Sequence, residues 1–224
     1  MSMPDQTAQI EWTGEVPRST LFDDPYYSLE DGAAETAHVF LGGNGLPERF
    51  APGFRIAELG FGTGLNVLCA WQAWRRAGIA GPLRFVSFEA FPMAAADMAR
   101  AHRALGIDDA LGAPLRAAWA AGRREFRTDE LHLSVIVGDA AVTVPAWDGL
   151  ADAWFLDGFS PARNPGLWAA PLLEAVAIHT APGGTAATYS AAGAVRRDLA
   201  AAGFEVSRVP GYGRKRHMSR AVLR

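Results

Sequence analysis

The sequence predicts an α/β fold in which helices cover a mainly parallel sheet. Short apolar segments alternate along the chain with longer segments whose apolar residues recur at helical spacing. Several apolar segments end in an acidic residue or in glycine, as strands do where a ligand site forms at their carboxyl ends. The last two apolar segments are joined only by residues 210–216, which is too short for a crossover helix, so we expect an antiparallel hairpin there.

Composition fits a single domain of this kind. The chain has 224 residues, 50% of them hydrophobic, which is enough for a substantial core. Its net charge of −3 gives no general indication of nucleic-acid binding, although residues 196–224 are locally basic. A single cysteine, Cys69, excludes a disulfide framework, and the histidines show no metal-ligand spacing. No segment has the length of a membrane span or the pattern of a signal peptide, so we expect a cytoplasmic protein with neither a metal nor a membrane partner.

Residues 1–50 are predicted to form a short N-terminal extension that packs on the core, and residues 51–224 the main domain. The extension holds a weakly helical segment, 30–40, followed by the turn signal Gly42-Gly43-Asn44-Gly45. We expect it to close over the sheet.

The first core strand, 54–59, runs into a glycine-rich turn and then into a helix. Gly60, Gly62 and Gly64 allow a close approach of ligand to backbone, and the helix start offers unpaired N–H groups. The spacing departs from the dinucleotide fingerprint, because the third glycine comes one position early. Glu58 would also repel a pyrophosphate but could hold the ammonium of a methionine moiety. The turn therefore favours S-adenosylmethionine (SAM) over NAD.

The next two strands also end in acids. The strand Leu83–Phe88 ends at Glu89, which is placed to accept hydrogen bonds from ribose hydroxyls. Helical segments are predicted over Met93–Leu105 and Pro114–Arg127. The third strand, Leu131–Val137, ends at Gly138-Asp139-Ala140, which could contact adenine or could equally form an ordinary turn.

The fourth strand, Ala151–Leu156, carries the best candidate for chemistry at its carboxyl end. The turn 157–165 begins with Asp157 and should face the Gly60 turn, because ligands of open α/β sheets sit beyond the carboxyl ends of strands. The remaining elements are a helix over 166–180 ended by Ala181-Pro182-Gly183-Gly184, a strand 185–190, a helix 195–202, and the hairpin strands 204–209 and 217–223.

Together these segments predict a cofactor site. Its members are Glu58, Gly60, Phe61, Gly62, Thr63, Gly64, Asn66, Glu89, Asp139, Ala140 and Asp157.

Specific motifs along nearly the whole chain resemble the methyltransferase domain of the MnmC family, which is named for tRNA 5-methylaminomethyl-2-thiouridine biosynthesis, and its stand-alone form MnmD. The most specific is D-A-W-F-L-D-G-F-x-P-x-x-N-P-x-x-W, residues 152–168; others are Phe22-Asp23-Asp24 with Tyr26, residues 39–44, residues 58–66, Ser87-Phe88-Glu89, residues 182–185 and residues 211–216. Arg163 and Ala194 depart from the family pattern, which has lysine and an aromatic residue there.

The resemblance implies a seven-stranded, Rossmann-like SAM methyltransferase sheet with a C-terminal antiparallel hairpin. It also implies SAM-dependent methylation of the aminomethyl nitrogen of 5-aminomethyl-2-thiouridine at the tRNA wobble position, with the anticodon loop as partner. The FAD-binding oxidase half of the bifunctional family members is absent from this sequence, so we expect other enzymes to supply the aminomethyl substrate.

Within this interpretation, two residues are candidates for catalysis. Asp157 could accept a hydrogen bond from the attacking nitrogen and help to take up its proton, although it could also merely cap the following turn. Phe159 stands beside it. The substrate contacts predicted are aromatic faces for a flipped base and polar or cationic groups for base and phosphates: Tyr26, Tyr27, Asn164, Trp168, Arg163, Arg214, Lys215 and Arg216.

Two alternatives stay open from the residues alone. The first is a SAM-dependent N-methyltransferase of a small-molecule or protein amine, since fold does not determine substrate. The second is a non-catalytic SAM-fold binding module, which the four acids Glu58, Glu89, Asp139 and Asp157 disfavour.

Overall fold

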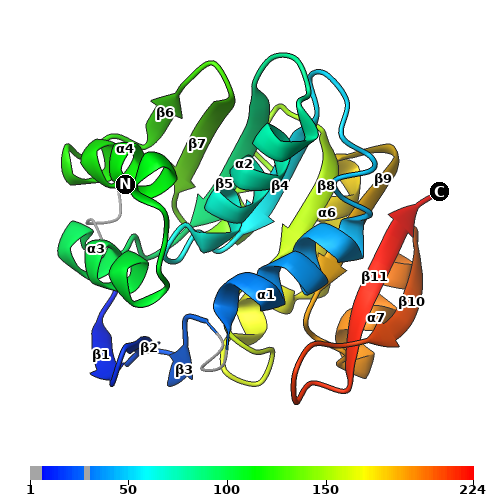
Figure 1. Ribbon diagram of the computed structural model, residues 1–224. Helices are drawn as coiled ribbons and strands as arrows, with labels where there is room; N and C mark the ends of the chain where they lie inside the picture. The colour runs from blue at the N-terminus through cyan, green and yellow to red at the C-terminus, as the bar shows by residue number, and fades with distance from the viewer. Residues whose placement is uncertain (1–6, 28–30) are drawn as a thin grey trace.

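An eight-stranded sheet forms the centre of the computed structural model, which describes residues 7–27 and 31–224 (Figure 1). The strand order is β10-β11-β9-β8-β4-β5-β7-β6. Five neighbouring strands are parallel: β4 (Arg55–Leu59), β5 (Leu83–Glu89), β7 (Leu131–Val137), β8 (Ala151–Leu156) and β9 (Thr180–Thr188). Antiparallel strands close both edges: β10 (Phe204–Pro210) with β11 (His217–Leu223) on one side, and β6 (Glu125–Arg127) on the other.

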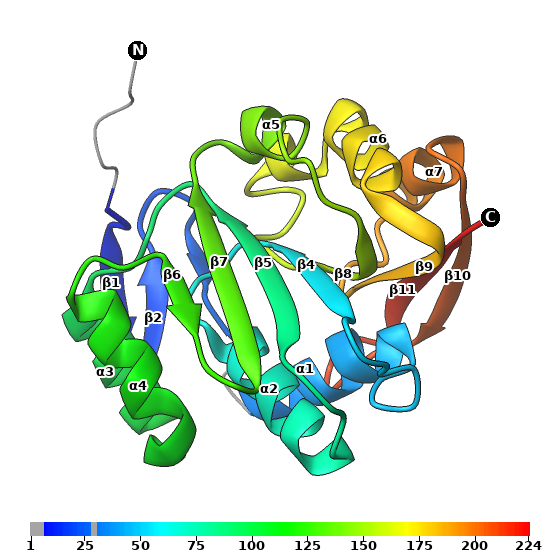
Figure 2. The ribbon, with the colours of Figure 1, turned by 90° about the horizontal axis from the view of Figure 1, so that it is seen from above.

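Helices cover both faces of this sheet (Figure 2). One face carries α2 (Leu65–Ala77), α3 (Ala95–Ala104), α4 (Asp109–Ala120) and the run α1 (Gly32–Thr36), η1 (Ala37–Leu41, a π-helix) and η2 (Gly42–Asn44, a 3₁₀ turn). The other face carries α5 (Ala140–Thr143), η3 (Pro165–Trp168, a 3₁₀ turn), α6 (Ala170–Ile178) and α7 (Gly193–Ala201). Because both faces are covered, the central strands must be apolar on both sides.

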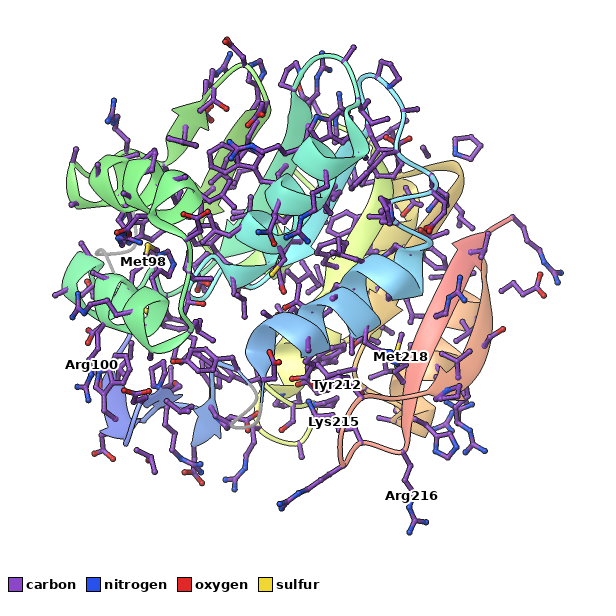
Figure 3. The ribbon with its side chains drawn as sticks, viewed as in Figure 1. Met98, Arg100, Tyr212, Lys215, Arg216 and Met218 are labelled. Carbon is purple, nitrogen blue, oxygen red and sulfur yellow. The ribbon has the colours of Figure 1, made fainter. Side chains whose placement is uncertain are left out.

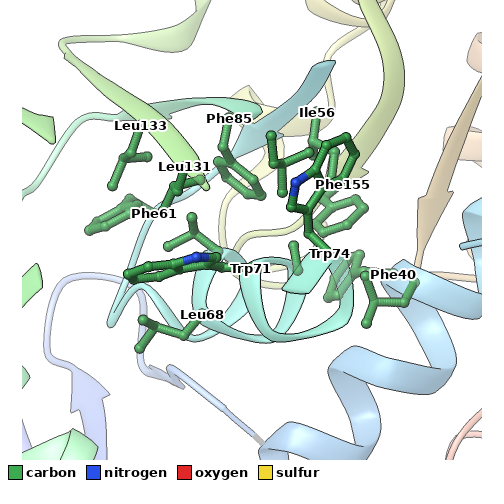
Figure 4. Packing of buried hydrophobic residues seen from close by; sticks show 14 of the residues in the cluster. Phe40, Ile56, Phe61, Leu68, Trp71, Trp74, Phe85, Leu131, Leu133 and Phe155 are labelled. Atoms are coloured by element: carbon green, nitrogen blue, oxygen red, sulfur yellow. The ribbon is translucent and has the colours of Figure 1, made fainter. Parts of the chain in front are cut away.

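Each central strand therefore contributes to two cores. On β4, Ile56 packs in the cluster under α2 and Ala57 in the cluster under α6, and both are 0% exposed. On β8, Phe155 packs in the cluster under α2 and Trp154 in the cluster under α6. Figure 4 shows the first cluster, in which Phe85 and Phe155 of the sheet meet the α2 indoles. This two-sided burial explains why the strands read as continuous apolar runs.

The N-terminal part forms a small sheet that the sequence did not predict. Strands β1 (Ile10–Thr13), β2 (Val16–Ser19) and β3 (Asp24–Pro25) pair antiparallel. Trp12 Nε1 donates to Asp97 Oδ1 over 3.0 Å, and the Arg100 guanidinium, labelled in Figure 3, lies 3.9 Å from the Trp12 ring centroid. Both contacts hold the small sheet against α3.

A buried asparagine attaches the segment after α1 to the main sheet. Asn44 is 0% exposed; its Nδ2 donates to the carbonyls of Phe40 (2.9 Å) and Trp154 (3.2 Å), and its Oδ1 accepts from Thr185 Oγ1 (2.6 Å). The segment packs on the sheet, while the division of the chain at residue 50 stays a prediction. The expected helix start at Glu30 lies outside the described residues.

The fold class is confirmed, but the sheet has eight strands rather than seven, because β6 was missed. The prediction of a helix over 114–127 was wrong at both ends: α4 begins at Asp109, where Asp108 caps it by accepting from Ala110 N (2.9 Å), and ends at Ala120. The three residues of β6 have no strand signal of their own. They become a strand by pairing with the edge of β7, which would otherwise leave backbone groups unpaired.

The segment around residue 180 also differs from the prediction. The expected helix over 166–180 is divided into η3 and α6, and residues 180–184 belong to β9 rather than to a helix end. Ala151 pairs with Thr180 but Ala153 pairs with Thr185, so an irregularity between these pairs takes up the extra residues. Tertiary pairing with β8 thus overrides the local turn signal.

In the parts of the chain that the structure describes, none of the helices has the length and hydrophobicity needed to cross a bilayer.

Replacing the buried asparagine should loosen the whole N-terminal side of the sheet. We expect Asn44→Ala to lower the free energy of unfolding by about 3 kcal/mol, because it leaves two carbonyls and the Thr185 hydroxyl without their partner. Urea unfolding followed by circular dichroism measures this. Glu48→Ala, an exposed change nearby, serves as control, and equal stability of the two variants would contradict the assignment.

Candidate active site

A cavity of about 1780 Å³ lies along the carboxyl ends of the parallel strands. Its wall includes one residue from the end of each of these strands, and four of the five are polar: Gly60 after β4, Glu89 at the end of β5, Asp139 after β7, Asp157 after β8 and Tyr189 after β9. The small N-terminal sheet, α1 and the β10–β11 connection complete the wall, and Figure 1 shows them gathered along the lower edge of the molecule. The sequence predicted a site at this edge.

The two turns expected to face each other are in contact. Gly60 has φ of +84°, and a Cβ there would lie 3.0 Å from the carbonyl oxygen of Asp157. Gly158 has φ of +152°, and a Cβ there would lie 2.2 Å from Leu167 Cδ2. Both positions therefore need glycine, for conformation as well as for space.

The Glu89 carboxylate accepts hydrogen bonds from backbone N–H groups at and near the glycine turn. Its Oε2 accepts from Gly62 N (3.0 Å) and its Oε1 from Phe91 N (2.7 Å). Burial raises the pKa of Glu89, and these backbone N–H groups oppose the rise. In dinucleotide enzymes such N–H groups bind pyrophosphate. A carboxylate already stands there in this chain, which disfavours a phosphate ligand and leaves acceptor oxygens for hydroxyl groups.

Asn66 joins two further acids. Its Nδ2 donates to Glu58 Oε1 (2.8 Å) and to Asp157 Oδ2 (2.7 Å), and its Oδ1 accepts from Thr36 Oγ1 (2.8 Å). Glu58 also accepts from Ser87 Oγ (2.6 Å) and is 0% exposed. One amide at the start of α2 thus fixes carboxylates from β4 and from the turn after β8.

The acids of this network are harder to ionise than usual. Burial raises the pKa of Glu58 well above its ordinary value, against the hydrogen bonds from Ser87 and Asn66, and the charge of Asp157 adds to the rise. Burial raises the pKa of Asp157 to about 6, opposed by hydrogen bonds from Asn66 and Gly158 N and by the charge of Lys215. Asp157 is thereby suited to exchange a proton near neutral pH.

Most predicted cofactor residues meet on the cavity wall. Those that line it are Gly60, Phe61, Gly62, Thr63, Asn66, Glu89, Asp139, Ala140 and Asp157, whereas Glu58 and Gly64 lie behind it. Asp139 caps α5, because its Oδ1 accepts a hydrogen bond from Ala141 N (2.9 Å). One of its two oxygens thus has the local capping role expected in an ordinary turn. Asp157 likewise accepts from Gly158 N (2.8 Å) while still facing the cavity.

An aromatic group stands beside Asp157. The Phe159 ring stacks on Phe22 with centroids 4.9 Å apart and meets the Tyr26 ring edge-on at 5.1 Å. All three line the cavity, as does Tyr27, whose hydroxyl donates to the Glu15 carbonyl over 2.6 Å. These rings form a surface on which a planar base can stack.

Other predicted substrate residues are dispersed. Asn164 lines the cavity, but Trp168 is 5% exposed and off the wall, and its Nε1 holds the Phe159 carbonyl at 2.8 Å. Arg163 Nη1 pairs with Asp23 Oδ2 at 2.9 Å, also off the wall. The geometry thus gives Trp168 and Arg163 supporting positions around the turn 157–165, and their direct substrate contacts stay predictions.

The β10–β11 connection places its three basic residues differently. Arg214 and Lys215 line the cavity, whereas Arg216 is exposed and extends away from the rest of the chain (Figure 3). Lys215 is turned toward α1, where Nζ lies 2.7 Å from Glu35 Oε1.

Several residues on the wall were missed as site residues, among them Phe22, Glu35 and Tyr189. Phe22 and Glu35 belong to the N-terminal part, where no local pattern marks them as cavity residues. Tyr189 directly follows β9, so the rule that ligands sit at the carboxyl ends of strands could have found it. Among the described His, Cys, Asp and Glu residues, no group of three is placed to hold a metal ion.

The donor set fits SAM. Acids at the ends of β5, β7 and β8 offer acceptors on the cavity wall for an ammonium and for hydroxyl groups, and the Gly62 N–H of the glycine turn already donates to Glu89. The cavity exceeds what a cofactor of this size fills, which leaves room for a second ligand beside Asp157.

Comparisons with known proteins agree with this geometry. Residues 110–224 match a family model described as "S-adenosyl-L-methionine-dependent methyltransferase". The chain is 44% identical over 223 residues to the tRNA 5-methylaminomethyl-2-thiouridine biosynthesis bifunctional protein MnmC of Chromobacterium violaceum, and 46% identical over 226 residues to that of Pseudomonas aeruginosa. Each alignment covers 95% of this chain but 34% of the relative. The chain thus spans about a third of the length of these curated relatives.

A solved structure extends the similarity to the fold. The crystal structure of MnmC2 from Aquifex aeolicus matches 99% of this chain and 72% of its own, with a TM-score of 0.75 and 26% identity.

The raised pKa of Asp157 makes stability depend on pH. A group whose pKa is higher in the folded state stabilises below its unfolded pKa, and this contribution is lost as the pH rises through the folded value. The free energy of unfolding of the wild type minus that of Asp157→Ala should therefore fall by roughly 2 to 3 kcal/mol between pH 4 and pH 7. Urea titrations at four pH values measure it, and a constant difference would show that Asp157 ionises normally.

Proposed function

The chain belongs to the S-adenosyl-L-methionine-dependent methyltransferases, and we propose that it methylates the aminomethyl nitrogen of 5-aminomethyl-2-thiouridine at the wobble position of tRNA. The product is 5-methylaminomethyl-2-thiouridine. The observation that carries the proposal is the Asp157 carboxylate, which lies on the cavity wall at the end of β8, held by Asn66 from the start of α2, with a stacking surface beside it. The relatives named for tRNA 5-methylaminomethyl-2-thiouridine biosynthesis support the choice of substrate.

The chain's main contribution to the reaction is alignment. SAM, when bound, supplies a methyl group on a positive sulfur that a neutral amine attacks in line. Glu89 would hold the ribose hydroxyls and Asp139 with Ala140 the adenine side. Asn66, positioned by Glu58 from behind the wall, would lie on the methionine side. Holding both reactants in line lowers the activation barrier, and well-aligned groups can gain about 7 kcal/mol in this way.

Asp157 accepts the proton that the substrate amine must lose before it can attack. The substrate arrives as an ammonium ion, which has no lone pair and cannot attack. The ammonium would give one proton to the Asp157 carboxylate, which leaves a lone pair on the nitrogen. That lone pair would form the N–CH₃ bond while the C–S bond breaks, and the electrons of the C–S bond would stay on sulfur. The product leaves as a secondary ammonium and Asp157 returns its proton to water. The raised pKa of Asp157 makes it a better acceptor than an ordinary aspartate.

The substrate base requires extrusion from the anticodon stack. Phe159, Phe22 and Tyr26 offer the aromatic faces on which a flipped base stacks, and Trp168 fixes the Phe159 backbone from behind. Arg214 on the wall, and Arg163 and Arg216 outside it, would contact phosphates. A tRNA partner and a place in the cytoplasm form part of the proposal.

We propose that the chain divides into an N-terminal extension, 1–50, and a methyltransferase domain, 51–224. Phe22, Tyr26 and Glu35, which line the cavity together with Asp157, support a role of the extension in the site. We propose that an oxidase supplies the aminomethyl substrate.

Nucleoside mass spectrometry tests the reaction. We expect tRNA carrying 5-aminomethyl-2-thiouridine to gain one methyl group on that nucleoside after incubation with the chain and SAM. Asp157→Ala should lower turnover by roughly 10² to 10⁴ while SAM still binds, because the general base is lost. Wild-type SAM binding without any gain would move the substrate to a small-molecule or protein amine, and failure to bind SAM by calorimetry would favour a non-catalytic module.

Salt dependence tests the tRNA contacts. The double variant Arg214→Ala with Arg216→Ala should bind tRNA more weakly, and the slope of log affinity against log salt should fall by about 1.4, because two phosphate contacts are lost. Filter binding over a salt series measures the slope. Arg76→Ala with Arg123→Ala removes the same charge from exposed sites elsewhere. Equal slopes for both double variants would refute a specific contact by residues 214 and 216.

A further inference from the structure

One ammonium group already lies in a cation-binding position inside the cavity. Lys215 Nζ is 2.7 Å from Glu35 Oε1 and 3.9 Å from the centroid of the Tyr189 ring. Lys215, Glu35, Tyr189 and Asp157 all line the cavity, and the charge of Lys215 acts on Asp157. A carboxylate and an aromatic face, which are groups that bind alkylammonium ions, thus hold this cation, and a second carboxylate, Asp157, lies on the wall of the same cavity.

The groups around this cation are held by the fold. Glu35 lies in the first turn of α1, whose start is capped by Asp31 Oδ1 accepting from Ala34 N (2.9 Å), and its side chain is only 13% exposed. Tyr189 donates its hydroxyl to the Gly158 carbonyl (2.6 Å), which fixes its ring next to Asp157.

The cation, in contrast, can leave. Lys215 extends into the cavity from the β10–β11 connection, outside the regular strands, and its side chain is 46% exposed. An ammonium on a flexible four-carbon stem exchanges one partner for another more readily than a rigid guanidinium does. The neighbouring Arg216 extends outward, away from the rest of the chain (Figure 3).

We propose that Glu35, Asp157 and Tyr189 form the subsite that recognises the substrate amine, and that Lys215 occupies this subsite until the substrate ammonium displaces it. The identity of the amine rests on the proposed function. Glu35 binds the ammonium and selects amine-bearing nucleosides, Asp157 takes its proton, and the displaced Lys215 becomes available to a phosphate of the same tRNA. Binding of the modified base is thereby coupled to binding of the tRNA phosphate backbone.

The subsite also selects against other substituents on the base. A neutral methyl or hydroxymethyl group cannot replace the Lys215 ammonium, because the two carboxylates would lose their cation. A substituent that carries its own carboxylate would add a third negative charge beside Glu35 and Asp157, which is unfavourable in a cavity.

Lys215 is the sole lysine of the chain, so displacement can be observed directly. Protein labelled with ¹³C-lysine gives one set of side-chain resonances, shifted by the Tyr189 ring current. We expect 5-aminomethyluridine, added with S-adenosylhomocysteine to prevent turnover, to move the Cε–Hε resonance toward the position of a solvated lysine. Uridine is the control and should leave the resonance in place. An unmoved resonance with bound 5-aminomethyluridine would overturn the proposal.

Kinetics on modified tRNA give the second measurement. Glu35→Gln should raise KM for tRNA carrying 5-aminomethyl-2-thiouridine by at least about tenfold, since a charge-assisted hydrogen bond is lost, with a smaller change in kcat. Glu174→Gln, an exposed change on α6, is the matched control. An unchanged KM in Glu35→Gln would contradict the assignment.

The pH profile separates this role from a structural one. The charged and titratable groups that act on Asp157 are Glu58, Lys215, Glu35 and Tyr189. Removing the positive charge with Lys215→Met should move the acidic limb of kcat/KM to higher pH, and Glu35→Gln should move it to lower pH. Shifts in the same direction would overturn the proposal.

The two proposals fail in different ways. If the wild type methylates the tRNA but Glu35→Gln behaves like it and the Lys215 resonance stays in place, only the amine subsite is refuted. If the wild type does not methylate this tRNA but 5-aminomethyluridine displaces Lys215, the subsite stands and the substrate is another amine.

Discussion

The double donation of the Asn66 amide is the interaction on which the site depends. Its two N–H bonds hold carboxylates from different strands, Glu58 and Asp157, and its carbonyl accepts from Thr36 on the opposite side. Two acids placed so close would repel each other in a buried site if no donor stood between them. Because Asn66 lies at the start of α2, directly after the glycine turn, the turn, the helix and both acids take their positions together.

The wall of the cavity needs the N-terminal part of the chain as much as the sheet. Asp24 Oδ2 accepts from the Ser160 N–H at 2.8 Å, and Phe22 stacks on Phe159, so the small sheet holds the turn that follows Asp157. Asn44 attaches the next segment to the β8 backbone. The parallel sheet supplies the acids, and the N-terminal segment completes the wall of the cavity around them.

Charge is distributed according to the ligands proposed. SAM carries a sulfonium and an ammonium, and the substrate amine enters as a cation, so acids dominate the cavity. The polyanionic tRNA would meet arginines at the rim, such as Arg214 and Arg216, although the whole chain is slightly acidic. An acidic interior and a basic rim explain how a chain with net charge −3 can serve a nucleic-acid substrate.

Seven strands of the main sheet, the glycine turn with Glu58 and Glu89, and Asp157 at the end of its strand could be predicted from the sequence, because each depends on a local pattern of apolar residues, glycine and acids. Only the tertiary structure decided the eighth strand β6 and the path of residues 180–184, because pairing with a neighbouring strand set both. It also decided that Trp168 supports the turn from behind and that Glu35 and Lys215 meet. Their contact joins residues 180 positions apart, and no local pattern encodes such a distance.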